Sequence, residues 1–296
     1  MQDYSFKIPL LPGAALAAIP EKHLDIAYAS QSGSQTLDVY LPEAPGPFPL
    51  IVHFHGGAFA LGTKRDANLT PMLRGLARGY AVASVEYRMS GEARFPALVY
   101  DAKAALRFLR ANAEKYRLDP VRFAAWGPSA GGYIAAMLGA TNFNLSFEDL
   151  TMGNEGFSSA VQAVVDWCGP AGDFCRMDEE IRENGVGKAD HDDPDSPESR
   201  LLGCAIQKVR ELSRLAAPHT HATKYAPPFL IHHGEADPVV PVQQSRTLAA
   251  AIAAQAGPER VRLVTFPGRG HHGEPWFDEP AMSDAVLDFL DEVLRR

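Results

Sequence analysis

The sequence has few cysteines, no long apolar run and no excess of basic residues, and each shortage excludes a class of protein. Its three cysteines, Cys168, Cys175 and Cys204, are too few for a disulfide-stapled secreted domain and fit a reduced cytosolic protein. A bridge between Cys168 and Cys175 stays an open alternative, because only a short loop separates them. No cysteine pair has the close ligand spacing of a zinc site, so the sequence predicts no metal.

Membrane and nucleic-acid functions are also disfavoured. No run reaches the roughly 18 apolar residues that span a bilayer, and the N-terminal stretch lacks the basic start of a signal peptide. We therefore expect a cytoplasmic protein, although a trimmed secreted form would look the same. The formal net charge of −8 at pH 7 argues against nucleic acid or an anionic membrane surface as a partner. The oligomeric state stays open, with a homodimer as one alternative.

Short runs rich in β-branched and aromatic residues alternate with helical patterns, which predicts an α/β fold with a mostly parallel sheet. Continuous apolar runs in the central strands indicate helices on both faces. We expect eight strands, the first two as an antiparallel edge hairpin, at 24–29, 36–42, 49–55, 80–87, 121–127, 161–167, 227–234 and 261–267. We expect helices near 68–78, 96–116, 130–140, 242–255 and 280–295.

The chain is long enough for one large domain over residues 1–296. One region breaks the alternation of strands and helices. Residues 172–218 are mostly polar and too long for an ordinary connection between a helix and a strand. They are predicted to form an inserted lid between the sixth and seventh strands.

The stretch Gly127-Pro128-Ser129-Ala130-Gly131 matches the pattern G-x-S-x-G between a predicted strand and a predicted helix. In that context the serine lies on a sharp turn that exposes its hydroxyl, and the two glycines relieve steric crowding around it. We therefore predict that Ser129 is a nucleophile. The alternative is a glycine-rich turn with an incidental serine.

The stretch "HFHGGAFALG" (53–62) follows the third predicted strand. Acyl transfer needs backbone N–H groups directed at the oxygen that becomes negative, and a glycine turn can present them at close range. We predict that Gly56, Gly57 and Ala130 donate these bonds. His55 is expected to hold the glycine loop by a hydrogen bond.

A serine nucleophile needs a histidine base, and the base needs a carboxylate that fixes its orientation. Asp237 follows the seventh predicted strand and His271 follows the eighth, which gives the order Ser, Asp, His at strand ends. We predict these two residues as the acid and the base. Glu235 stays the alternative acid, and His272 stays the alternative base.

Four large aromatic residues adjoin these loops. Each could line an acyl or aromatic pocket, or could belong to the core, and the sequence leaves both interpretations open. They are Phe59, Trp167, Trp276 and Phe277.

From about residue 24 to its end, the chain resembles the α/β-hydrolase carboxylesterases through "HGGAF", "YRMSGEARFPALVYDAKAALRFLRANAEKYRLDP", "WGPSAGG", "HGEADPVVP" and "GRGHHG". The hormone-sensitive-lipase-like branch usually has a third glycine and an Asp where Ala58 and Pro128 stand here. The stretches "YRMSGEARFP" and "VVDWCGPAGDF" are instead similar to the branch of bacterial carbohydrate acetyl and feruloyl esterases. The resemblance implies the α/β-hydrolase fold, and it carries the family's triad and oxyanion roles onto Ser129, Asp237, His271, Gly57 and Ala130.

Together these features predict a serine carboxylesterase that acts through an acyl-enzyme on short-chain or small aromatic esters, acetyl and feruloyl esters of carbohydrates included. The expected partner is a small-molecule ester, and no cofactor is needed. An arylformamidase, a peptidase or a non-catalytic small-molecule receptor on the same scaffold are the alternatives. Activity should fall as pH drops through the ordinary histidine pKa of about 6.5, because the base must be neutral.

Overall fold

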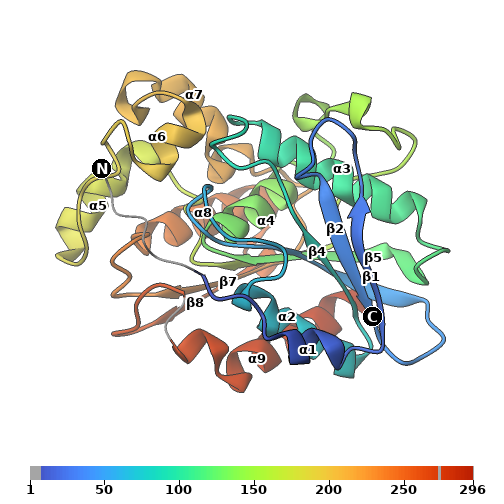
Figure 1. Ribbon diagram of the computed structural model, residues 1–296. Helices are drawn as coiled ribbons and strands as arrows, with labels where there is room; N and C mark the ends of the chain where they lie inside the picture. The colour runs from blue at the N-terminus through green and yellow to red at the C-terminus, as the bar shows by residue number, and fades with distance from the viewer. Residues whose placement is uncertain (1–7, 273–274, 296) are drawn as a thin grey trace.

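Eight strands form one twisted sheet with the order β1-β2-β4-β3-β5-β6-β7-β8 (Figure 1). This computed structural model describes residues 8–272 and 275–295. β2 runs antiparallel to both of its neighbours, and the other neighbouring pairs are parallel. The eight predicted strands and the antiparallel edge hairpin are confirmed. The strands are β1 Glu21–Ala27, β2 Thr36–Leu41, β3 Phe48–Phe54, β4 Ala81–Val85, β5 Leu118–Pro128, β6 Ala163–Trp167, β7 Phe229–Gly234 and β8 Val261–Phe266.

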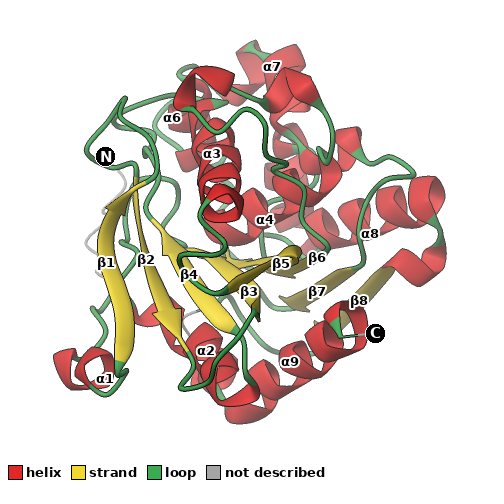
Figure 2. Cartoon of the chain, turned by 90° about the vertical axis from the view of Figure 1, so that its right-hand side faces the viewer, coloured by secondary structure: helices red, strands yellow, loops and turns green. Residues whose placement is uncertain are grey.

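Helices cover both faces of the sheet (Figure 2). Along β3 the side chains of Leu50 and Val52 enter the core beneath α3, α4 and α8, whereas Ile51 enters the core beneath α2 and α9. This burial on both faces explains why the central strands are continuous apolar runs. The α-helices are α1 Gly13–Ala17, α2 Thr70–Leu73, α3 Ala97–Ala111, α4 Ala130–Ala140, α5 Met177–Asn184, α6 Pro197–Leu202, α7 Arg210–Ala216, α8 Gln243–Ala256 and α9 Pro280–Leu294.

One predicted helix, at 68–78, is not continuous. It consists of the short α2 between two 3-10 turns, Ala67–Leu69 and Arg74–Arg78. Pro71 lies in the first turn of α2, and Gly79 ends the segment in a left-handed conformation with φ 76°. The remaining predicted helices are confirmed.

The segment 172–218 joins β6 to β7 and contains α5, α6 and α7. Ser196 caps α6 by accepting a hydrogen bond from the Ser199 backbone N–H at 3.1 Å. Although most residues of the segment are polar, it also contributes a set of buried apolar side chains to the main core. These are Phe174, Met177, Leu201, Leu202, Ile206 and Ala216.

Two further sequence predictions concern cysteines and membranes. All three cysteines are free, so the alternative bridge between Cys168 and Cys175 is not formed. The Cys175 Sγ instead lies 3.5 Å from the Ser213 Oγ. Among the described residues, no helix combines the length and the apolar character needed to cross a membrane.

Candidate active site

Ser129 lies at the turn between β5 and α4, with φ 52° and ψ −119°. A positive φ is strained for a residue with a side chain, and such strain persists only where the surroundings enforce it. A Cβ on Gly127 would lie 2.5 Å from the carbonyl carbon of Gly131, and a Cβ on Gly131 would lie 2.0 Å from the Phe54 carbonyl oxygen. The steric reason predicted for both glycines is confirmed.

His271 and Asp237 form a chain of hydrogen bonds with Ser129. The Nε2 atom of His271 lies 3.0 Å from the Ser129 Oγ, and its Nδ1 atom lies 2.6 Å from the Asp237 Oδ2. Since an ionised carboxylate only accepts, Nδ1 carries the hydrogen and Nε2 is left to accept from the serine hydroxyl. The structure thus brings together the three residues that the sequence places at the ends of β5, β7 and β8.

The Asp237 carboxylate is 1% exposed and fully engaged. Its Oδ1 atom accepts from the backbone N–H groups of Val239 at 2.8 Å and Val240 at 2.9 Å. Burial alone would raise the pKa of Asp237, but His271 and His233 hold it well below its usual range. The carboxylate is therefore ionised and its direction toward His271 is fixed.

His233 is a site residue that sequence reasoning did not find. Its Nε2 atom lies 3.2 Å from the Asp237 Oδ2 and 2.8 Å from the Val240 carbonyl oxygen. Its Nδ1 atom lies 2.6 Å from the Ser245 Oγ, which ties it to α8. The signals in the sequence are its position, four residues before Asp237 at the end of a strand, and its place as the first residue of the stretch "HGEADPVVP".

The loop after β3 presents the predicted oxyanion donors. Gly57 has φ 120°, and a Cβ there would lie 2.2 Å from the Leu61 carbonyl oxygen, so only glycine fits. No described group accepts from the Gly57 N–H. As the first residue of α4, Ala130 has a backbone N–H without an acceptor inside its helix. Both amides are available for a negative oxygen.

His55 fixes this loop through both of its ring nitrogens. Nδ1 lies 2.8 Å from the Gly56 carbonyl oxygen and Nε2 lies 3.1 Å from the Glu86 Oε1. Both of these partners are acceptors, which favours a ring protonated on both nitrogens. Burial alone would lower the pKa of His55, but Glu86 raises it above its ordinary value. With the Gly56 carbonyl held by His55, the Gly57 N–H points in the opposite direction.

The structure also places the two alternative residues. The ring of His272 packs against Gly56, with Nε2 3.0 Å from the position of a Cβ there, and burial together with His271 lowers the pKa of His272 to about 3. Glu235 instead accepts a hydrogen bond from Thr265 at 2.8 Å. The hydrogen-bonded chain to Ser129 runs through Asp237 and His271.

Comparison with known proteins shows the family to which this chain belongs. The BD-FAE family model matches residues 37–252, which include the glycine loop, Ser129 and Asp237. The chain belongs to the BD-FAE family. The predicted resemblance to the α/β-hydrolase carboxylesterases is thereby confirmed. His271 lies beyond the matched span, and its place beside Ser129 comes from the geometry above.

Relatives of this BD-FAE chain carry esterase names. Esterase LipC of Mycobacterium tuberculosis is 31% identical over 242 residues, which make up 80% of this chain and 57% of LipC. Among solved structures, the bifunctional GH43-CE protein of Bacteroides eggerthii is 34% identical with a TM-score of 0.80, over 92% of this chain and 35% of that chain. A truncated carbohydrate esterase from gut microbiota is 31% identical with a TM-score of 0.82, over 94% of this chain and 98% of that chain. The chain spans about half to three fifths of the length of the curated relatives it matches.

An apolar cavity of about 250 Å³ lies next to the nucleophile turn. Pro128 and His272, the sequence neighbours of Ser129 and His271, line it together with two of the predicted pocket residues, Trp167 and Phe277. Both aromatic side chains are buried, and their ring centroids lie 5.0 Å apart.

The other two predicted pocket residues differ. Phe59 is 2% exposed, contacts the Tyr133 ring edge-on at 5.2 Å and lines none of the described cavities, so its ring belongs to the core. Of the two interpretations left open for Phe59, the structure favours the core, and positive φ values at Ala58 and Phe59 make a tight turn in the loop there. Trp276 lies in the 3-10 turn Pro275–Asp278, and its side chain is outside the described part of the chain.

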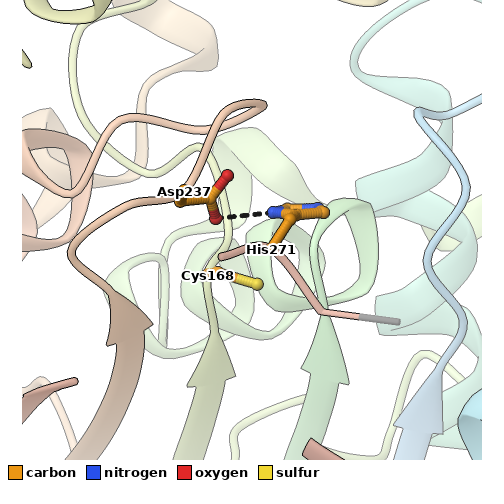
Figure 3. A group of neighbouring side chains, drawn as sticks. All are labelled: Cys168, Asp237 and His271. Carbon is orange, nitrogen blue, oxygen red and sulfur yellow. Dashed lines mark hydrogen bonds and ion pairs between the residues drawn. The ribbon is translucent and has the colours of Figure 1, made fainter. Parts of the chain in front are cut away.

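Cys168 is an unpredicted neighbour of the hydrogen-bonded pair (Figure 3). One ligand atom each of Cys168, Asp237 and His271 lie within 4.8 Å of one another. Cysteine, carboxylate and imidazole also occur as zinc ligands, but a metal here would compete with the bond between His271 and Asp237. Burial, with the charge of Asp237, raises the pKa of the Cys168 thiol well above its usual value. The Cys168 thiol is therefore protonated and packs beside Asp237 and His271.

Proposed function

We propose that this chain is a serine carboxylic ester hydrolase that acts on short-chain or small aromatic esters through an acyl-enzyme. The observation that carries the proposal is the continuous chain of bonds from Asp237 through His271 to Ser129, at 2.6 and 3.0 Å. The esterase names of its relatives support the same reaction class.

The first half of the reaction forms the acyl-enzyme. The Nε2 of His271 takes the hydroxyl proton of Ser129 as Oγ bonds to the ester carbonyl carbon. The carbonyl oxygen becomes negative and accepts from the backbone N–H groups that the sequence predicts as donors, those of Gly56, Gly57 and Ala130. The bond to the alcohol oxygen then breaks, and His271 returns its proton to the departing alcohol.

The second half repeats these steps with water. His271 removes a proton from water, the hydroxide oxygen attacks the acyl carbon, and the Ser129 Oγ leaves with the proton that His271 returns. Asp237 keeps Nδ1–H directed away from the serine and stabilises the imidazolium that forms twice in each cycle. The products are one carboxylic acid and one alcohol.

The apolar cavity next to the nucleophile turn supports small acyl groups. Its volume of about 250 Å³ is below the roughly 300–1,000 Å³ of pockets that hold drug-sized ligands. Trp167 and Phe277 give it aromatic walls that suit an acetyl, short-chain or single-ring acyl group. The names of two solved relatives, a GH43-CE protein and a carbohydrate esterase, extend the proposal to acyl esters of carbohydrates.

A fluorophosphonate probe followed by peptide mass spectrometry tests the nucleophile. We expect one labelled serine, Ser129, and no label in the variant Ser129→Ala. A p-nitrophenyl ester series from acetate to dodecanoate tests the acyl group and should show its highest kcat/KM at or below about eight carbons. Formylkynurenine and a peptide amide should be turned over far more slowly than acetylated xylooligosaccharides or methyl ferulate. An unlabelled Ser129 in folded protein would refute the mechanism.

A further inference from the structure

A second, wider cavity of about 880 Å³ lies on the other side of the glycine loop. Its walls come from the loop after β4, the turn between β1 and β2, and the part of the insertion around α6. Ala60 belongs to its lining, and the backbone N–H of Ser90, also in its lining, donates to the Phe59 carbonyl oxygen at 2.8 Å. The wall is therefore bonded to the same segment that presents the oxyanion donors.

The two cavities lie over opposite faces of the sheet. The apolar cavity adjoins Trp167 and Phe277, which belong to the core beneath α2 and α9. The wider cavity adjoins the insertion, whose Leu201 and Ile206 belong to the core beneath α3, α4 and α8. An ester bound at Ser129 has two ends, an acyl group and an alcohol, and the two cavities differ in character.

The wider cavity has a local excess of positive charge. Arg94, Arg200 and Lys208 line it against one carboxylate, Glu92, in a chain whose acidic residues outnumber its basic residues by 36 to 28. Both oxygens of Glu92 already accept from hydroxyl groups of the β1–β2 turn, at Ser32 and Ser34. The one acidic lining residue is thus held by the turn between the strands.

The three basic side chains that line the wider cavity differ in whether a carboxylate lies close to them. Arg200 lies 3.6 Å from the Asp195 carboxylate. Neither Arg94 nor Lys208 has a carboxylate within 4 Å among the described residues. The exposed Arg94 side chain passes over Gly203 at the end of α6, where a Cβ would be 2.3 Å from its Nε. Two cations in this cavity are therefore available to an anionic ligand.

We propose that this cavity binds the alcohol part of the ester and selects alcohols that carry a carboxylate, such as the uronic-acid units of carbohydrates. The proposal rests on the proposed esterase function. A planar guanidinium binds a carboxylate through two parallel hydrogen bonds, and an ammonium group adds a second, movable charge. The polar hydroxyl and backbone groups of the walls suit a sugar, whereas the aromatic walls of the other cavity suit the acyl group.

Two substrates that differ only in charge test the proposal. O-acetylated methyl glucuronoside and O-acetylated methyl glucoside carry the same acyl group, and only the first has a carboxylate at C6. We expect KM for the glucuronoside to be about 3- to 10-fold lower at low salt, with similar kcat, because exposed ion pairs are weak individually. Added sodium chloride should reduce the difference.

The double variant Arg94→Gln/Lys208→Gln should remove this preference, so that the two sugars show similar KM values. The matched control is Lys188→Gln, which removes an exposed lysine of the same insertion that pairs with Asp190 at 2.7 Å and lines none of the described cavities. The control should keep the wild-type preference. Equal KM values for both sugars in the wild type, or an unchanged preference in the double variant, would overturn the proposal.

Calorimetry on Ser129→Ala separates this proposal from the proposed function. With the intact acetylated glucuronoside as ligand, binding that is lost in the Arg94→Gln/Lys208→Gln background supports the cavity even if the wild type hydrolyses neither sugar. Hydrolysis of both sugars with no charge preference leaves the esterase standing and removes the cavity proposal. Inorganic phosphate that binds these two cations more tightly than glucuronate would overturn carboxylate as the selected group.

Discussion

Two histidine–carboxylate pairs lie at the carboxyl edge of the sheet, one on each side of the strand that ends at Ser129. His271 pairs with Asp237 on the β7–β8 side, and His55 pairs with Glu86 on the β3–β4 side. In both pairs one ring nitrogen faces the carboxylate. The pairs differ at the other nitrogen, which faces the Ser129 hydroxyl in one case and the Gly56 carbonyl oxygen in the other.

That single difference separates the proposed catalytic base, His271, from His55, which holds the glycine loop in place and is called the brace below. A hydroxyl can donate, so the second nitrogen of His271 is free to accept a proton. A carbonyl oxygen only accepts, so the second nitrogen of His55 must donate and has no lone pair to offer. A histidine beside a carboxylate is therefore not by itself a catalytic base, and the partner of its other nitrogen decides the role.

The largest expected effect comes from removing the base. His271→Gln should lower kcat for p-nitrophenyl acetate by on the order of 10⁴-fold or more, because triad members act as a unit. The matched control is the adjacent His272→Gln, which changes a ring that packs on Gly56 and lies outside the hydrogen-bonded chain. Steady-state kinetics on both variants decides the assignment. A loss in His272→Gln as large as that in His271→Gln would contradict it.

Removing the His55 ring should lower kcat less than removing His271 does, because it disturbs the glycine loop and leaves the hydrogen-bonded chain to Ser129 in place. In His55→Gln the peptide between Gly56 and Gly57 loses its anchor, and a shift of about 1 Å in a positioned group can cost about 10²-fold. We expect this loss in kcat with little change in KM, since the oxyanion forms only after the substrate binds. Fluorophosphonate should still label Ser129, but more slowly. A variant with wild-type kcat would show that the loop keeps its shape without His55.

The comparison also shows what the sequence could and could not predict. The nucleophile turn and the glycine loop are local motifs, so Ser129, Gly57 and Ala130 could be assigned from adjacent residues. Asp237 and His271 could be assigned because parallel strands end at one edge. The choice of His271 over His272 depends on which ring faces Ser129, and no spacing rule contains that information.

Other features depended on packing that is distant in sequence. His233 and Cys168 contact the pair only because β6, β7 and β8 are neighbours, and the stretches "HGEADPVVP" and "VVDWCGPAGDF" that contain them do not reveal these contacts. The aromatic residues show the same limit, because Trp167 lines a cavity whereas Phe59 is buried in the core. The insertion was expected to be polar from its composition, but it buries Phe174 and Met177 completely. The position of a residue along the sequence therefore predicts the sheet edge at which it lies, but it does not predict the direction in which its side chain points.

A change at His233 tests whether its contact with Asp237 contributes to the activity of His271. His233→Phe removes one hydrogen bond to the Asp237 Oδ2 and leaves the two backbone bonds from Val239 and Val240 in place. One hydrogen bond to a charged group is worth about 1.5–3 kcal/mol, so kcat should fall by about 10- to 150-fold. The pH–rate profile should shift as well, since Asp237 loses one of the contacts that keep it ionised. His232→Phe, the neighbouring change on the same strand, is the control and should leave that profile unchanged.

The smallest effect should appear in stability rather than in rate, at Glu86. The folded-state pKa of His55 is raised, so the folded protein binds more protons than the unfolded chain between about pH 6.5 and that raised pKa. The free energy of unfolding should therefore fall as pH rises through this window, by at most about 1.4 kcal/mol per pH unit for one proton. In Glu86→Gln only the charge of Asp66 and the hydrogen bond to Gly56 still oppose burial, so the pKa of His55 should fall and this slope should become smaller.

Urea unfolding from pH 5 to 9 measures both slopes. His191, whose pKa burial alone would lower and Glu198 raises to about 9, contributes a slope of the same sign in every variant, so the difference between variant and wild type carries the result. Glu235→Gln is the matched control, because that carboxylate contacts Thr265 and Arg246 and pairs with no histidine among the described residues. It should keep the wild-type slope. A Glu86→Gln slope equal to that of the wild type would mean that His55 is neutral, and the contrast between base and brace would then have to rest on position alone.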